Sequence, residues 1–162
     1  MGENTASGRT RIERRSEREL VVTRVFDAPV RLVFDAWAKA ELFQLWWAPK
    51  SVGMTLRSCE IDARTGGGYR LVFAHGEGGS MAFFGRYLEV VPQSRMVWTN
   101  DEGGEGAVTT VTFEEKDGAT LVVLREVYPS KEAFEADAGH EEAMPEQFEQ
   151  LDELLKTLAA KV

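Results

Sequence analysis

The stretch from Thr55 to Tyr128 consists of six apolar-rich segments, each followed by turn-forming residues. The separating stretches read RTGGG, GEGGS, PQS, DEGGEG and KDG, and YPS follows the last segment. Glycine, proline and aspartate favour tight turns, and strands joined by short turns pair as antiparallel neighbours. The chain is therefore expected to fold largely as an antiparallel meander. The β-branched stretch ELVVTRVF, residues 19–26, predicts one further strand.

A different periodicity follows near the C-terminus. Met144, Phe148, Leu151, Leu155 and Leu158 recur at alternating steps of four and three residues. Acidic side chains occupy the opposite face, as in an amphipathic helix with one apolar stripe. The sequence therefore predicts one long C-terminal helix. Helical spacing between residues 30 and 49 fits either one helix or two.

Together these elements predict an α+β fold in which a curled antiparallel sheet of about seven strands surrounds the long helix. A helix is only about 10 Å across, too narrow to cover the whole concave face of such a sheet. The first helical segments would close the remaining space, leaving a cavity with an apolar wall. Ordinary core packing is the alternative for each single residue of this wall. The residues expected to line the cavity are Phe34, Trp37, Trp46, Trp47, Tyr69, Leu71, Phe73, Tyr87, Met96, Trp98, Phe113, Arg125, Met144, Phe148 and Leu151.

Two adjacent tryptophans, Trp46 and Trp47, stand just before Pro49. Neighbours on a helix point about 100° apart, so both rings cannot face one core. We expect Trp46 to face the interior and Trp47 to cover the entrance between the helical segment and the sheet. The alternative is that Trp47 only anchors the following loop.

Six motifs in order resemble the SRPBCC proteins, the superfamily of START and Bet v-like domains. They are VTRVFDAP, LFQLWWAPKSVG, CEIDARTGGGYR, GRYLEVVPQSRMVWT, VTTVTFEE and GHEEAMPEQFEQLDELL, and they extend from Glu19 to about Ala160. Within the superfamily they resemble the branch named after the activator of the ninety-kilodalton heat-shock protein's ATPase. The resemblance implies a helix-grip fold with two short helices after the first strand and a break near Lys39.

Members of that superfamily typically hold a hydrophobic cavity, and relatives carry lipids, plant hormones or polyketides. The resemblance thus implies a small hydrophobic or amphipathic ligand, and a homodimer, since family members are often dimers. The eukaryotic activator acts through a separate N-terminal domain for which this chain has no room, so a chaperone partner is not expected. Ala48, Ala143 and Met144 depart from glycine, glycine and tryptophan of the family pattern.

Composition excludes several classes of partner. The net charge of −8 opposes binding to nucleic acid, and no apolar run reaches the roughly 20 residues that span a bilayer, so no membrane insertion is expected. The start of the chain lacks the apolar centre of a signal peptide, which predicts a cytoplasmic protein. Residues 1–17, with four arginines, are expected to form a flexible basic tail, and residues 18–162 a single domain.

Catalytic and cofactor motifs are mostly missing from the sequence. With only two histidines, His75 and His140, no metal site is expected, and the glycine clusters match no phosphate-binding or dinucleotide motif, so no cofactor is expected. His75 and Arg125 share the strand phase of the cavity residues and are the catalytic candidates. Arg125 lying in water at the end of the sheet is the alternative.

Three functions follow from these observations. The first is a non-catalytic domain that binds a small hydrophobic ligand. The second is a cyclase-, hydrolase- or isomerase-like enzyme that uses the same cavity. The third is a chaperone-interacting module.

Overall fold

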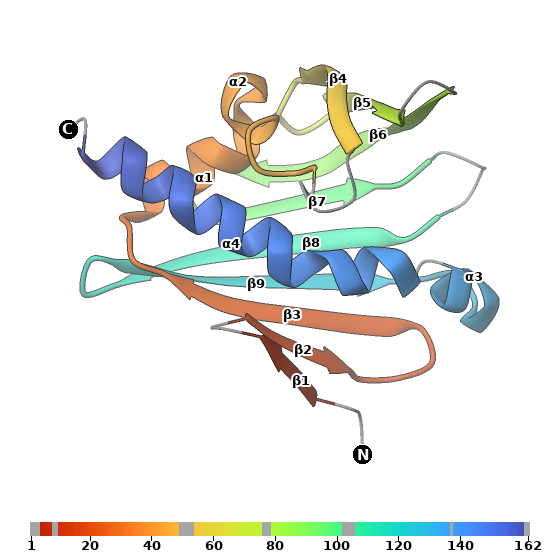
Figure 1. Cartoon of the computed structure of the whole chain (residues 1–162). Coiled ribbons are helices and arrows are strands. Elements are labelled where there is room, and N and C mark those ends of the chain that lie inside the picture. The colour runs from red at the N-terminus through yellow and green to blue at the C-terminus, as the bar shows by residue number, and fades with distance from the viewer. Residues whose placement is uncertain are drawn as a thin grey trace.

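The structure is a computed structural model, and it describes residues 4–7, 10–48, 54–75, 79–101, 106–136 and 138–160. Nine strands form one antiparallel sheet in the order β1-β2-β3-β9-β8-β7-β6-β5-β4 (Figure 1). The strands are β1 Asn4–Ser7, β2 Thr10–Arg14, β3 Glu19–Phe26, β4 Met54–Ile61, β5 Gly68–His75, β6 Gly79–Val91, β7 Arg95–Thr99, β8 Val108–Lys116 and β9 Ala119–Val127. The helices are α1 Val30–Ala38, α2 Ala40–Phe43, α3 Lys131–Ala136 and α4 Ala138–Ala160.

The predicted elements are confirmed. The seven strands expected from alternation and turn chemistry are β3 to β9, and the amphipathic C-terminal segment is α4. Lys39 has extended backbone angles, with φ −102° and ψ 124°, and separates α1 from α2 as the family resemblance implied. The Ser130 hydroxyl accepts a hydrogen bond from the Ala133 N–H at 3.1 Å and so caps α3.

The expectation of a flexible tail is wrong for residues 4–7 and 10–14. These residues form the hairpin of β1 and β2, and β2 pairs with β3. Thr10 and Ile12 are buried, and the Thr10 hydroxyl accepts a hydrogen bond from Arg24 at 2.9 Å. The arginine-rich composition of this stretch concealed the alternation that buries Thr10 and Ile12 while it leaves Arg11 and Arg14 exposed.

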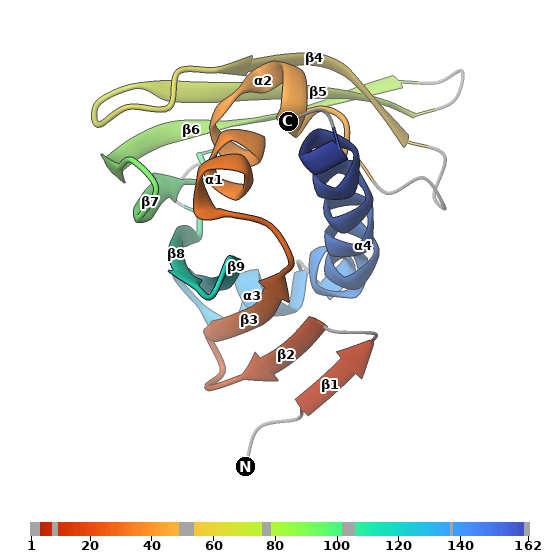
Figure 2. The same ribbon diagram turned by 90° about the vertical axis from the view of Figure 1, so that its left-hand side faces the viewer.

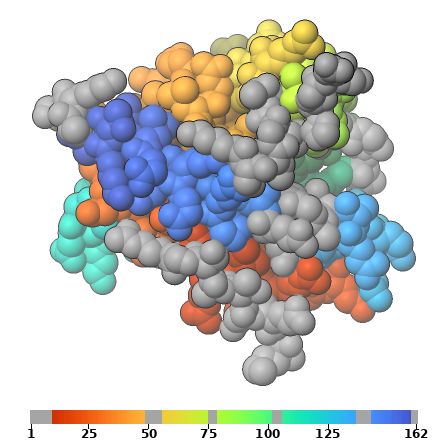
Figure 3. Space-filling model, in the orientation of Figure 1, coloured from red at the N-terminus to blue at the C-terminus, as the bar shows by residue number. Residues whose placement is uncertain are grey.

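The sheet curves around α1 and α4, as the end-on view in Figure 2 shows. Helix α4 packs against α1, α3, β2 and β3, whereas α1 packs on β8 and β9 and α2 packs on β4. In the space-filling view, α4 crosses the molecule between the residues of α1 and α2 and those of β2 and β3 (Figure 3). The helices therefore cover the concave face unequally.

Trp37 of α1 is the centre of the core. Its ring lies 4.7 Å from the ring of Trp46, 6.1 Å from Phe148 of α4 and 6.2 Å from Phe113 of β8, measured between centroids. Each of these four side chains is at most 5% exposed. Edge-to-face packing of this kind fixes α1 and α4 against the sheet.

The predicted phase of β9 is wrong. Val122, Leu124 and Glu126 face the concave side and are buried, so Arg125 lies on the convex side. Arg125 is half exposed, and its Nε lies 3.1 Å from a carboxylate oxygen of Glu19 on β3. Alternation could not fix the phase because the core of this strand, LVVL, is apolar at every position.

Candidate functional site

The concave faces of β4 to β7 form the least covered part of the interior, which we call the open half. Several of the side chains that point inward from these strands contact the core but remain partly exposed, unlike the apolar ones on β3, β8 and β9. The partly exposed residues include Leu56, Cys59, Ile61, Tyr69, Phe83 and Trp98. An apolar, concave and accessible surface of this kind is typical of small-molecule sites.

Three aromatic rings form the centre of the open half. The ring centroids of Tyr69 and Tyr87 are 5.9 Å apart, and that of Trp98 lies 6.5 Å from Tyr69 and 6.2 Å from Tyr87. Gly85 makes this arrangement possible, because a Cβ there would collide with the Thr99 carbonyl oxygen and lie 3.0 Å from the Tyr69 ring. Trp37 lies behind Trp98, with 6.0 Å between ring centroids, so the site rests directly on the core.

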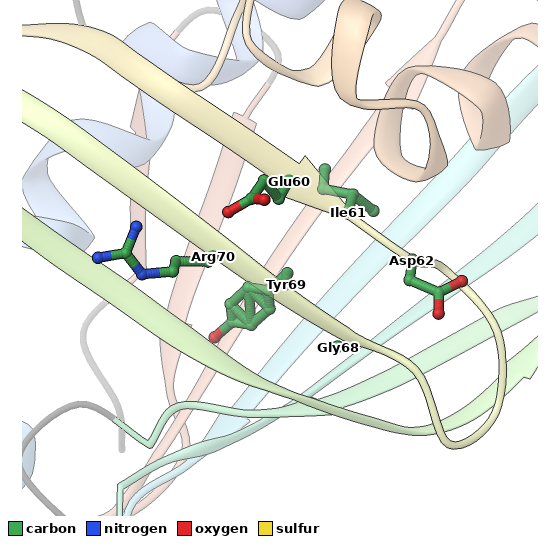
Figure 4. A pocket seen from close by; sticks show the side chains of 6 residues that line it. All are labelled: Glu60, Ile61, Asp62, Gly68, Tyr69 and Arg70. Atoms are coloured by element: carbon green, nitrogen blue, oxygen red, sulfur yellow. The ribbon is translucent and has the colours of Figure 1, made fainter.

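A shallow, open groove of about 320 Å³ lies at the hairpin end of the open half. It is lined by Glu60, Ile61, Asp62, Gly68, Tyr69 and Arg70 (Figure 4). Tyr69 and Ile61 are partners across the β4–β5 ladder, and Glu60 and Arg70 are the next pair. Successive ladder pairs point to opposite faces, so the groove includes side chains from both faces of the sheet at its β4 edge.

Hydrogen bonds fix the position of the Tyr69 ring. Its hydroxyl donates to the Thr99 carbonyl oxygen at 2.8 Å and to Asn100 Oδ1 at 3.1 Å. The Asn100 amide in turn donates to the Thr109 hydroxyl at 3.1 Å, and Thr109 donates to Glu126 Oε2 at 2.9 Å. A buried chain of this kind holds the ring rigidly at the edge of the site.

Sequence reasoning missed Glu126 because it assigned the opposite phase to β9. This carboxylate is 5% exposed and also accepts a hydrogen bond from the Tyr128 hydroxyl at 3.3 Å. Its partner across the ladder is Thr109, so a correct strand phase is the signal that would have found it. Hydrogen bonds through Thr109 and Asn100 connect Glu126 to Tyr69.

Burial changes the acidity of two groups in the open half. Desolvation raises the pKa of the Cys59 thiol to about 11. Desolvation, and then the nearby Cys59 and Asp62, raise the pKa of Tyr87 above its ordinary value. Both side chains are therefore neutral at physiological pH.

The predicted cavity residues divide between the core and the open half. Tyr69, Tyr87 and Trp98 lie in the open half, with Leu71 and Phe73 buried beneath its surface. Arg125 is excluded by its convex position, and the side chain of His75 lies outside the described residues. The members buried in the core are Phe34, Trp37, Trp46, Met96, Phe113, Met144, Phe148 and Leu151.

The paired tryptophans have different surroundings. Trp46 is completely buried and its indole N–H donates to the Ala36 carbonyl oxygen at 3.0 Å. Trp47 is partly exposed and stacks on Phe43, with ring centroids 4.8 Å apart. The Gln147 amide of α4 donates to the Trp47 carbonyl oxygen at 2.5 Å, so this segment is attached to the C-terminal helix.

The described residues were compared with the requirements of a metal site and of a membrane-spanning helix. Within the part of the chain that the structure describes, no group of three or more histidine, cysteine or acidic side chains is placed to hold a metal ion. None of the described helices is long and apolar enough to cross a membrane.

A curved antiparallel sheet around a C-terminal helix, with two short helices after β3, defines a helix-grip protein. Residues 27–156 match the family described as Activator of Hsp90 ATPase homolog 1-like protein, and the chain belongs to this family. The resemblance seen in the sequence is thereby confirmed. No curated protein matches the sequence.

Solved structures share this fold. A Rhodobacter sphaeroides protein is similar with a TM-score of 0.84 and 24% identity, over 92% of this chain and 99% of that one. A Nitrosomonas europaea protein has a TM-score of 0.79 and 24% identity, over 90% and 98% of the two chains. An AHSA1-like protein from Aeromonas hydrophila has a TM-score of 0.65 and 17% identity, over 82% and 92%. At these identities the likeness establishes the fold alone.

Proposed function

We propose that the protein binds a small hydrophobic or amphipathic molecule in the open half and does so without catalysis. The observation that carries this proposal is the partial exposure of inward-pointing Cys59, Ile61, Tyr69 and Trp98 on a surface that the helices leave incompletely covered. Burying such a surface under a ligand is favourable by about 25 cal/mol per Å² of apolar area.

An enzymatic use of the same site has weaker support. Of its two candidate groups, Arg125 lies on the convex face and is paired with Glu19. The buried Glu126 accepts hydrogen bonds from Thr109 and Tyr128 and is linked to the site through the chain to Tyr69. Binding without reaction therefore accounts better for the described residues.

Trp47 is proposed to form the boundary of the entrance to this site. The side chain packs partly exposed against Phe43, and the adjacent carbonyl groups of Trp46 and Ala48 each accept a hydrogen bond from Gln150 at 2.9 Å. Ligand-dependent fluorescence quenching in a Trp47→Phe variant tests the idea. Quenching equal to that of the wild type would contradict the proposal that Trp47 borders the entrance.

Native mass spectrometry of freshly purified protein tests the proposed function. We expect a co-purifying small molecule, and we expect Ile61→Glu to abolish its retention by placing a charge in the open half. Leu88→Glu is the matched control, because Leu88 is 47% exposed outside the site. Loss of the molecule in both variants, or a wild-type protein that binds neither a copurifying molecule nor an added apolar probe, would contradict the proposal. Chaperone capture by such a ligand-free protein would favour the interaction module instead.

A further inference from the structure

Two hydrogen-bond donors in the open half have no partner among the residues that the structure describes. Tyr87 is 5% exposed, and while its backbone pairs with Gly66 and Gly67, its hydroxyl forms no hydrogen bond with the described residues. The indole N–H of Trp98, whose ring lies 6.2 Å from that of Tyr87, likewise forms none with them. The hydroxyl of neighbouring Tyr69, by contrast, is bound to Thr99 and Asn100.

An unpaired donor at this depth is unusual. Most buried polar side-chain atoms are hydrogen-bonded within the protein, whereas the Tyr87 hydroxyl is left to water or to a ligand. In the described part of the chain, the unpaired side-chain atoms fully sealed from solvent are Arg24 Nε, Trp37 Nε1 and Gln147 Oε1. The Tyr87 hydroxyl is not one of these, so it borders accessible space and can meet a group that enters the site.

The surrounding charges define what kind of group that is. Of the charged residues in the groove, Glu60 and Arg70 form the ladder pair that points to the convex face, whereas Asp62 lies near Tyr87. Desolvation, and then the nearby Cys59 and Asp62, raise the pKa of the Tyr87 hydroxyl, so the phenol stays protonated as a donor. The titratable groups that act on the Tyr87 hydroxyl are Cys59 and Asp62, and Asp62 is itself paired with Arg64 at 3.0 Å. A neutral acceptor suits this donor, because burying a ligand carboxylate here would cost more than burying a carbonyl oxygen.

We propose that the ligand is a neutral, flat and largely apolar molecule whose carbonyl-type oxygen accepts a hydrogen bond from the Tyr87 hydroxyl, with the Trp98 indole as a second donor. Its apolar plane packs on the Trp98 ring and meets the Tyr69 ring at an angle, since these two rings are inclined by 72°. This inference rests on the proposed function and specifies the polar end of the ligand.

Three probes with one ring system test the inference. They are 2-acetylnaphthalene, which carries a carbonyl, 2-ethylnaphthalene, which carries none, and 2-naphthoate, which is an anion. We expect the ketone to bind about fivefold more tightly than the hydrocarbon, which is the size of one neutral hydrogen bond, and the anion to bind most weakly. Dissociation constants from calorimetry or tryptophan quenching give both ratios.

Tyr87→Phe should remove the ketone preference and leave the affinity for the hydrocarbon unchanged. Tyr128→Phe is the matched control, since the Tyr128 ring stacks on Phe134 and its hydroxyl is bound to Glu126. Trp98→Phe supplies an independent second test and should reduce the preference. An unchanged preference in Tyr87→Phe, or tightest binding of 2-naphthoate, overturns the inference while the proposed function stands. If wild-type protein binds none of the three probes, the proposed function itself fails.

Discussion

The two halves of the concave face differ in how completely helices cover them. On the closed half, formed by β2, β3, β8 and β9, inward residues such as Val22, Phe26, Val122 and Leu124 have no solvent exposure. On the open half, Ile61, Tyr69 and Trp98 share the same inward orientation but stay partly exposed. The difference follows from widths, because strands lie about 4.8 Å apart and a helix about 10 Å across covers only two or three of them.

This comparison separates stability from binding. The closed half has α1 and α4 packed on it and carries most of the fully buried side chains. The open half keeps apolar surface that a ligand can bury. Substitutions in the two halves should therefore have different consequences.

The largest difference is expected for matched phenylalanine truncations. Phe148→Ala in α4 should lower the free energy of unfolding by about 4 kcal/mol, because the ring is fully buried against Phe26, Trp37 and Trp46. Phe83→Ala in the open half should cost about 1.5 kcal/mol, since that ring is partly exposed. Urea unfolding of both variants measures the two losses in the free energy of unfolding. Equal losses would contradict the difference between the closed half and the open half.

The second-largest effect on stability is expected for a buried ion pair. Arg24 on β3 is 2% exposed and its guanidinium lies 3.7 Å from Asp152 of α4. Arg24→Ala should cost about 3 kcal/mol, because it leaves the carboxylate with only Lys156. Arg95→Ala, which breaks the exposed pair with Glu89, should cost about 0.5 kcal/mol or less. A small effect at Arg24 would show that α4 is held by apolar packing alone.

The reactivity of Cys59 gives a further test of the difference between the two halves. The pKa of Cys59 is raised from 9.0 to about 11, so near neutral pH its thiolate fraction and alkylation rate should be about 100-fold below those of an unperturbed thiol. The raised pKa means that the rate should rise about tenfold per pH unit and level off only near pH 11.

The native protein should nevertheless react without unfolding, since Cys59 is partly exposed. The control is Val22→Cys combined with Cys59→Ser, which should react only through unfolding because Val22 is fully buried. Kinetics of maleimide labelling across denaturant concentrations distinguish the two positions. Identical dependence on denaturant would contradict an open half.

The smallest effect is expected where the two halves meet. Gln150→Met should lower the free energy of unfolding by about 1.5 kcal/mol, because it leaves the carbonyl groups of Trp46 and Ala48 without their donor. Gln147→Met should be nearly neutral, since it loses one bond to Trp47 but also removes the unpaired Oε1. Thermal unfolding of the two variants measures which loses more stability. A larger loss in Gln147→Met would exclude Gln150 as the main attachment of the Trp46–Ala48 segment to α4.

Much of the fold was predictable from local patterns, but the site was only partly so. Turn residues and alternation located β3 to β9, and the four-three spacing located α4. Tyr69 was assigned correctly to the concave face because Gly68 and Arg70 flank it, whereas alternation is weaker around Tyr87 and Trp98, whose neighbours include Leu88 and Val97. Arg125 was assigned wrongly and Glu126 was missed, because consecutive apolar residues in β9 carry no phase information.

The sequence by itself determined the element order, the strand pairing implied by short turns, the amphipathic helix and the family, because each depends on neighbouring residues or on motifs in order. Tertiary structure alone decided which face β9 presents, whether the N-terminal residues join the sheet, and which aromatic rings become core. Those outcomes depend on contacts between distant segments, such as Arg24 with Thr10 and Asp152. An aromatic ring on the concave face is part of the core where a helix covers it and stays partly exposed where none does.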